Sequence, residues 1–147
     1  MSQPTDPSLL SGKRAYQGGC HCGAVRFSAD IDLGKGASRC NCSVCLKTGV
    51  TSTMIKPADF TLLSGQDHLQ TYEWGYRISQ RFFCKACGVH SFARGHLEEV
   101  GGDYVSVNVS CLDDIEPTAI KVVHWDGRHD NWEQGPRDTP WPVHAAV

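Results

Sequence analysis

Cysteine is the residue type in this sequence with the clearest capacity for chemistry. Seven of the eight cysteines fall into three tight groups: Cys20 and Cys22; Cys40, Cys42 and Cys45; and Cys84 and Cys87. Thiolates this close in sequence can bind one metal ion together, because zinc takes sulfur ligands at roughly 2.3 Å. Glycines next to the groups, such as Gly23 and Gly88, allow the tight turns that such binding needs. The grouping therefore predicts metal binding.

The number of grouped cysteines suggests two metal sites of different kinds. A structural zinc site is closed by four protein ligands, whereas a catalytic zinc site has three and leaves the fourth position for water or substrate. Seven cysteines match one site of each kind. Spacing alone leaves the partition open, because a four-thiolate set can also be built from Cys42, Cys45, Cys84 and Cys87. The 38 residues between Cys45 and Cys84 count against that set, since a compact zinc ribbon has roughly 15 to 20.

The expected cellular compartment supports metal binding over disulfide bonds. The first residues lack the cationic start and apolar middle of a secretory signal, so we expect a cytoplasmic protein with reduced thiols. Disulfides or buried free cysteines are the alternatives. Cys111 stands alone and shares one face of a predicted strand with Val105, Val107 and Val109, which predicts a core residue and not a ligand.

Composition narrows the class of protein. The chain has 147 residues, of which 40% are hydrophobic and 20% charged, and its formal net charge is -2. These values fit one globular domain and give no support for nucleic-acid binding. No apolar run approaches the roughly 18 residues of a membrane helix, so we expect no membrane partner. The sequence does not determine the oligomeric state.

The elements that position the cysteines are predicted to be short β-strands. Apolar and polar residues alternate over short stretches that end at glycine-containing turns, a pattern typical of half-buried strands. The predicted strands are 24–31, 51–55, 60–64, 69–74, 78–83, 105–111 and 119–124. A single helical turn is expected at 113–116. The fold class is therefore all-β, with antiparallel sheets and short helical turns, stapled by zinc.

Two tails flank the predicted domain. Residues 1–15 are rich in proline, serine and glycine without periodicity, so we expect a disordered N-terminal tail. Residues 16–128 form the predicted zinc-binding domain. Residues 129–147 retain Trp132 and Trp141, which predicts an extended segment packed on the domain.

The order of the motifs resembles the glutathione-dependent formaldehyde-activating family, which includes the centromere-protein-V-like proteins. The motifs are Gly18-Gly19-Cys20-His21-Cys22-Gly23, Cys40-Asn41-Cys42-Ser43-Val44-Cys45 and Phe83-Cys84-Lys85-Ala86-Cys87-Gly88, and the Trp125-Asp126-Gly127 turn also looks like a family feature. The resemblance implies a zinc-stapled β-tent with two zinc ions per chain. It implies that Cys20, Cys22, Cys84 and Cys87 hold the structural zinc, and that Cys40, Cys42 and Cys45 are catalytic residues that hold the other.

The activity implied by the resemblance is that of a carbon-sulfur lyase which adds formaldehyde, or another small aldehyde, to glutathione or a similar thiol. A metal with an open position can lower the pKa of an incoming thiol. Glutathione carries two carboxylates, for which the nearest cations in sequence are Arg39, Lys47, Arg77 and Arg81. Ordinary surface charge is the alternative role for these residues.

Histidines and tryptophans near the motifs have two possible roles. His21, His90 and His96 can serve as ligands or proton shuttles, or lie at the surface. His124, Trp125 and Trp132 can line a substrate pocket, or pack the C-terminal segment on the sheet.

Two further functions compete with the lyase. A non-catalytic zinc module that binds a protein partner needs only the closed site and has no use for three extra thiolates. A redox sensor would form a disulfide within the middle group when the metal is lost. The middle group, Cys40, Cys42 and Cys45, favours the enzyme.

Overall fold

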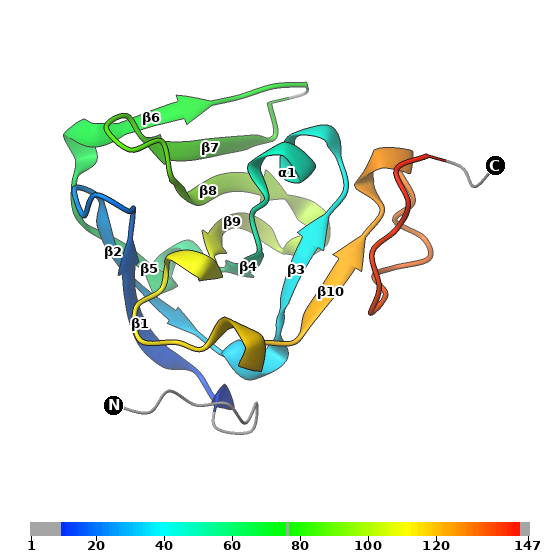
Figure 1. The fold of residues 1–147 in the computed structure, drawn as a ribbon, viewed down its shortest axis with the longest axis horizontal. Coiled ribbons are helices and arrows are strands. Elements are labelled where there is room, and N and C mark those ends of the chain that lie inside the picture. Colours follow the sequence, from blue (N-terminus) through cyan, green and yellow to red (C-terminus); the bar gives the residue numbers. More distant parts are fainter. Residues whose placement is uncertain (1–9, 76, 145–147) are drawn as a thin grey trace.

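The structure is a computed structural model that describes residues 10–75 and 77–144 (Figure 1). Its strands form two sheets, one of three strands in the order β1-β2-β5 and one of seven in the order β10-β3-β4-β9-β8-β7-β6. The three-stranded sheet is antiparallel and consists of β1 (Arg14–Gly19), β2 (Arg26–Ile31) and β5 (Phe60–Ser64). The all-β class expected from the sequence is confirmed.

The seven-stranded sheet contains Cys40 and Cys84 at the ends of two of its strands. Its strands are β3 (Ala37–Cys40), β4 (Ser52–Ile55), β6 (Leu69–Tyr72), β7 (Ser79–Cys84), β8 (His90–Leu97), β9 (Gly102–Asn108) and β10 (Val122–Trp125). Neighbouring strands are antiparallel except β3 and β10, which run parallel with Trp125 opposite Cys40. The sheet is therefore mixed, and β3 and β10 end at the same edge (Figure 1).

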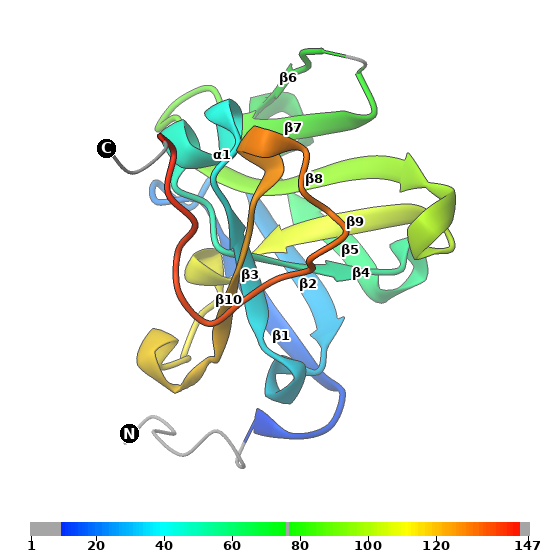
Figure 2. The same ribbon diagram turned by 90° about the vertical axis from the view of Figure 1, so that its right-hand side faces the viewer.

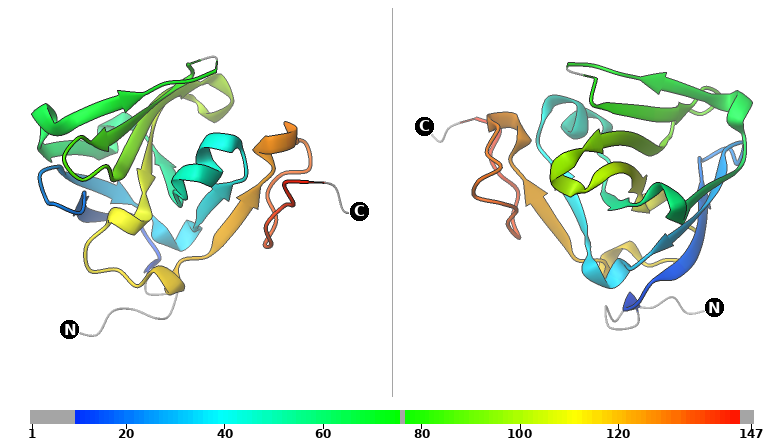
Figure 3. Two further views of the ribbon diagram at one scale, coloured as in Figure 1. Left: turned by 45° about the horizontal axis from the view of Figure 1, so that its top comes forward. Right: turned by 180° about the vertical axis from the view of Figure 1, so that it is seen from behind.

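Short helical elements join the strands. The α-helix α1 (Ser43–Thr48) follows β3 and ends at Gly49, whose φ of 69° is left-handed. The two views of Figure 3 place α1 between the β6–β7–β8 end of the sheet and the β3–β10 end. The remaining helical elements are 3₁₀ turns: η2 (Leu33–Lys35), η3 (Pro57–Asp59), η4 (Gln66–His68), η5 (Glu98–Val100), η6 (Val109–Cys111), η7 (Pro117–Ala119) and η8 (Gly127–His129).

An aromatic cluster at the centre of the core connects the two sheets. Phe27 on β2 stacks on Phe60 on β5, with ring centroids 5.4 Å apart, and Phe60 lies 4.6 Å from Phe92 on β8. All three rings are buried, as are Val105 and Val107 on β9. Alternation of apolar and polar residues along β2 and β9 turns these side chains inward, and their burial stabilises the packing of one sheet on the other.

The seven predicted strands each overlap an observed one, with differences of up to three residues at their ends, but β1, β3 and β8 were not predicted. The helical turn expected at 113–116 is wrong in position, because the 3₁₀ turn η7 begins at Pro117, whose fixed φ suits the first position of a turn. Strand β9 ends at Asn108, so Cys111 lies in the turn η6 and is only partly buried against the core.

Described residues beyond both ends of the predicted domain, such as Leu10 and Trp141, pack on it. Residues 1–9 of the predicted N-terminal tail lie outside the described residues. The boundary expected after residue 15 is too late, because Leu10 is 3% exposed and β1 begins at Arg14. After β10 the chain passes over β10 and β3, as Figure 2 shows in orange and red. Trp141 Nε1 donates to the carbonyl of His124 at 2.9 Å, which fixes this segment on the domain.

The described residues contain no helix long and apolar enough to cross a membrane.

We predict that Phe60→Ala lowers the free energy of unfolding by about 3 to 5 kcal/mol, because it removes the ring that joins the two sheets. The measurement is urea unfolding of the metal-loaded protein. Thr61→Ala, on the exposed face of the same strand, is the control and should change the value by less than about 0.5 kcal/mol. Equal effects would show that the aromatic cluster does not hold the sheets together.

Candidate metal centres

Four cysteines from two sheets meet at one point. Cys20 and Cys22 follow β1, Cys84 ends β7, and Cys87 lies in the turn after it. Their four sulfur atoms all lie within 4.8 Å of one another. We call these residues the four-cysteine group.

The spacing of these sulfur atoms fits a tetrahedral metal ion. Cys22 Sγ lies 3.6 Å from Cys20 Sγ and 3.7 Å from Cys84 Sγ. Zinc–sulfur bonds of about 2.3 Å in a tetrahedron place the sulfur atoms about 3.8 Å apart, whereas a disulfide bond is about 2.05 Å long. All eight cysteines are free thiols. The donor set is therefore the one that closed structural zinc sites use.

Local turns hold the four sulfur atoms in place. The backbone N–H of Val25 donates to Cys20 Sγ at 3.3 Å, and the N–H of Gly88 donates to the carbonyl of Cys84 at 2.7 Å. Gly88 has a φ of 78°, a left-handed conformation that few residues other than glycine adopt. The tight turns expected around both cysteine pairs are present.

The other cysteine cluster is built from a single short segment. Cys40 is the last residue of β3, Cys42 is the N-cap of α1, and Cys45 lies in the first turn of that helix. Their sulfur atoms also lie within 4.8 Å of one another, and all three residues are partly buried. We call them the three-cysteine group. The chain brings the sulfur atoms together here because a helical turn starts immediately after an extended strand.

No fourth donor joins the three-cysteine group among the residues that the structure describes. Neither a histidine nor a carboxylate lies within the same distance of these sulfur atoms in residues 10–75 and 77–144. The alternative four-thiolate set of Cys42, Cys45, Cys84 and Cys87 does not form. The group thus offers three ligands and leaves one side free.

The three sulfur atoms of the three-cysteine group differ in how strongly their surroundings favour negative charge. Hydrogen bonds with Cys40 and Cys45 lower the pKa of Cys42, and the same contacts with its neighbours raise the pKa of Cys45. The guanidinium Nη2 of Arg81, on β7, lies 4.0 Å from Cys45 Sγ. Cys42 is therefore the member of the group whose thiolate form its neighbours favour.

A buried carboxylate fixes the backbone between the ligands. Asn41, between Cys40 and Cys42, is 7% exposed, and its Nδ2 donates to Asp126 Oδ1 at 2.8 Å. Asp126 is 5% exposed and also accepts a hydrogen bond from Asn131 Nδ2. Burial opposes ionisation of Asp126, but hydrogen bonds from Asn41, His129 and Asn131 outweigh it and hold its pKa below the usual value.

Gly127 lies directly against the three-cysteine group. A Cβ atom at this position would be 2.5 Å from Cys40 Sγ, 3.3 Å from Cys42 Cβ and 3.1 Å from Trp132 Cη2. The parallel pairing of β3 with β10 creates this contact, because both strands deliver their ends to the same edge of the sheet. A glycine is needed here for close approach.

The basic residues suggested by the sequence lie in different surroundings. Arg81 contacts Cys45, as described above, and Arg39 Nη2 donates to the carbonyl of Gly49 at 3.2 Å. Lys47 is exposed on α1, and Arg77 is exposed in the β6–β7 turn with a φ of 57°. Of these four candidates, Arg81 is the one in contact with a cysteine sulfur.

The histidines and tryptophans suggested by the sequence also lie in different surroundings. His21 is exposed, and His96 Nδ1 lies 2.6 Å from Asp103 Oδ1, so neither faces the three-cysteine group. The rings of Trp125 and Trp132 pack at 5.9 Å, and Trp132 lies beside Gly127. Trp132 is thus close to the group and still 53% exposed.

Sequence reasoning missed Asn41, Arg128 and His129 as residues of this site. His129 Nδ1 lies 2.7 Å from Asp126 Oδ1, and the backbone N–H of Arg128 donates to Asn41 Oδ1 at 2.9 Å. Asn41 and Asp126 are separated by 85 positions, so spacing alone gives no sign of their contact. The available signal was an asparagine flanked by cysteines, together with the Trp125-Asp126-Gly127 turn.

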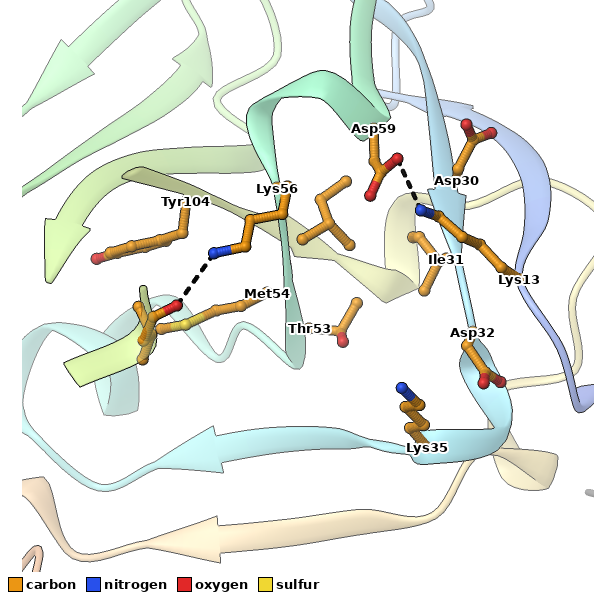
Figure 4. Close-up of a pocket in the computed structure, with 12 residues that line it drawn as sticks. Lys13, Asp30, Ile31, Asp32, Lys35, Thr53, Met54, Lys56, Asp59 and Tyr104 are labelled. Atoms are coloured by element: carbon orange, nitrogen blue, oxygen red, sulfur yellow. Dashed lines mark hydrogen bonds and ion pairs between the residues drawn. The ribbon is translucent and has the colours of Figure 1, made fainter. Parts of the chain in front are cut away.

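The surface hollows lie away from the cysteines. One of about 320 Å³ is lined by residues of β2, β4 and η2, and another of about 360 Å³ by residues near β7 and β8. In the first, Lys13 is paired with Asp59 at 2.9 Å and Lys56 donates to the carbonyl of Val100 (Figure 4). No cysteine lines either hollow. The cysteine groups therefore lie outside both of these hollows.

The fold and the two cysteine groups define a β protein with candidate metal sites of the closed and the open kind. Residues 15–127 match the family model described as glutathione-dependent formaldehyde-activating enzyme. The chain belongs to this family, as its motifs indicate.

Two relatives support the match. A Halomonas elongata protein, provisionally named a glutathione-dependent formaldehyde-activating enzyme, is 33% identical over 79 residues, which are 48% of this chain and 50% of that protein. The match thus spans about half the length of this relative. The crystal structure of a Rhodobacter sphaeroides protein superposes with a TM-score of 0.62 at 27% identity, over 86% of this chain and 99% of that one.

We predict that Gly127→Ala lowers the bound metal from two ions per chain to one, because the added methyl group displaces Cys40. Metal analysis of the purified variant against protein concentration is the measurement. Glu133→Ala, at an exposed position of the same segment, is the control and should keep both ions. Full metal content in Gly127→Ala would contradict this role for the glycine.

Proposed function

We propose that the protein is a zinc-dependent carbon-sulfur lyase that joins formaldehyde, or a similar small aldehyde, to glutathione. The observation that carries this proposal is the three-cysteine group, which provides three sulfur ligands and no fourth donor from the described residues. Membership of the formaldehyde-activating family supports the substrates. Cysteines clustered as metal ligands are typical of a reducing compartment such as the cytoplasm.

The proposed reaction adds a thiol to an aldehyde and gives a thiohemiacetal. With formaldehyde, the product carries a hydroxymethyl group on sulfur. The thiol sulfur forms a bond to the carbonyl carbon, the C=O double bond becomes a single bond, and the thiol proton ends on the oxygen. A zinc ion, when bound by Cys40, Cys42 and Cys45, supplies an open position and a positive charge that favour the thiolate form of the substrate.

The protein's own residues prepare this site for a negatively charged sulfur. The guanidinium of Arg81 stands 4.0 Å from Cys45 Sγ, so it offsets the charge that accumulates where several sulfur atoms meet. Asp126 and Asn41 hold the segment between Cys40 and Cys42, so the three ligands keep their positions when substrate enters or leaves. Catalysis gains from such fixed placement, because no reorganisation is needed during the reaction.

The four-cysteine group has a different task in this proposal. It joins the end of β1 in the three-stranded sheet to the end of β7 in the seven-stranded sheet. Four thiolates satisfy a zinc ion completely, so no position remains for substrate. We assign Cys20, Cys22, Cys84 and Cys87 to the structural zinc and Cys40, Cys42 and Cys45 to the catalytic zinc.

The activity can be tested by exchange NMR. Formaldehyde and glutathione form their adduct slowly without a catalyst, and the zinc-loaded protein should accelerate exchange between free aldehyde and adduct. Protein treated with a chelator and Cys42→Ser are the controls, and neither should accelerate exchange. If the zinc-loaded protein leaves the exchange rate unchanged with a panel of thiols and aldehydes, the lyase is excluded and a non-catalytic zinc module becomes the better description.

We predict that Cys84→Ser and Cys42→Ser have different effects. Structural zinc sites contribute on the order of 10 kcal/mol of folding free energy, so Cys84→Ser should unfold or aggregate. Cys42→Ser should remain folded with one zinc ion and lose turnover. Circular dichroism melting and metal analysis of both variants make the comparison. Equal loss of stability would remove the distinction between a structural and a catalytic site.

A further inference from the structure

We propose that Arg128 binds a carboxylate of the thiol substrate, so that the site selects thiols that carry an acidic group. This inference rests on the proposed function and names the residue that recognises the substrate. The turn after β10 holds the Arg128 side chain next to the three-cysteine group.

Arg128 is attached to the residue between two of the cysteines. Its backbone N–H donates to Asn41 Oδ1 at 2.9 Å, and its side-chain Nε donates to the Asn41 carbonyl at 3.1 Å. Asn41 is buried and stands between Cys40 and Cys42. The preceding residue, Gly127, packs against Cys40 Sγ. The guanidinium is therefore fixed at the rim of the three-cysteine group.

The free end of this guanidinium is available for a ligand. Arg128 is exposed, and in the described part of the chain neither of its terminal nitrogens donates to a carboxylate or carbonyl. Arg26 differs, since both of its terminal nitrogens bond to Asp113, and Arg137 donates to Pro140 and lies over the Trp141 ring. A guanidinium held at Nε presents a planar pair of N–H groups that matches the two oxygens of a carboxylate.

The two other arginines near the three-cysteine group have different contacts. Arg81 faces the sulfur of Cys45, where it acts on the charge of the ligands, and Arg39 donates to the carbonyl of Gly49. Arg128 lies next to the group, its Nε is held by a hydrogen bond, and its two terminal nitrogens are available for a ligand. A thiol bound at the open side of the group, with its carboxylate several bonds from sulfur, can place that carboxylate against the terminal nitrogens of Arg128. Glutathione has this chemistry.

The test compares glutathione with its diethyl ester, in which both carboxylates are neutral. Calorimetric titration of the zinc-loaded wild-type protein should give an affinity for glutathione about 10- to 100-fold higher than for the ester, as expected for a hydrogen-bonded charge pair. Arg128→Gln should lose this preference by weakening glutathione binding and leaving ester binding within about twofold. Arg14→Gln, which removes the same charge from the exposed start of β1, should keep the preference.

Each outcome separates this inference from the proposed function. Binding of neither thiol by the wild-type protein would overturn both. Equal wild-type affinities for glutathione and the ester would overturn the role of Arg128 alone, and this result does not depend on the folding of any variant. The same holds if Arg128→Gln keeps two zinc ions and still prefers glutathione. Loss of preference in Arg14→Gln as well would indicate general surface charge and overturn the assignment.

Discussion

The hydrogen bond between Asn41 and Asp126 is the interaction on which the candidate active site depends. The three-cysteine group must hold its sulfur atoms around one point and leave one side free, which a flexible loop does not do. The buried Asp126 carboxylate restrains the backbone between Cys40 and Cys42, and the parallel pairing of β3 and β10 brings that carboxylate to the group. The arrangement of the three-cysteine group is therefore a consequence of sheet topology as well as of cysteine spacing.

In the proposed function, the two cysteine groups divide stability and reactivity between them. The four-cysteine group joins two sheets and draws its sulfur atoms from segments that are distant in sequence, so metal binding there restrains the whole fold. The three-cysteine group spans six residues at the start of one short helix, so changes in its metal or ligand can remain local. A structure of this kind can exchange ligands at one site without weakening the other.

Much of the fold could be predicted from sequence because its signals are local. Alternation marks β2 and β9, and cysteine spacing marks both groups. Strand β3 escaped prediction because Ala37-Ser38-Arg39-Cys40 contains no large apolar side chain that would mark a buried face, and β8 because Arg94, Gly95 and His96 break the apolar pattern. The contacts of Asp126 and Arg128 with Asn41 bridge more than 80 positions, so they depend on strand pairing that no local pattern encodes.

The central claim is that the three-cysteine group leaves a ligand position open for a thiol. Cobalt(II) in place of zinc tests it most directly, because sulfur-to-cobalt absorption reports the number of thiolate ligands. We expect the spectrum of the fully loaded protein to gain intensity when glutathione is added, as the second site goes from three thiolates to four. A spectrum that already shows four protein ligands at both sites, and that glutathione leaves unchanged, would contradict the account.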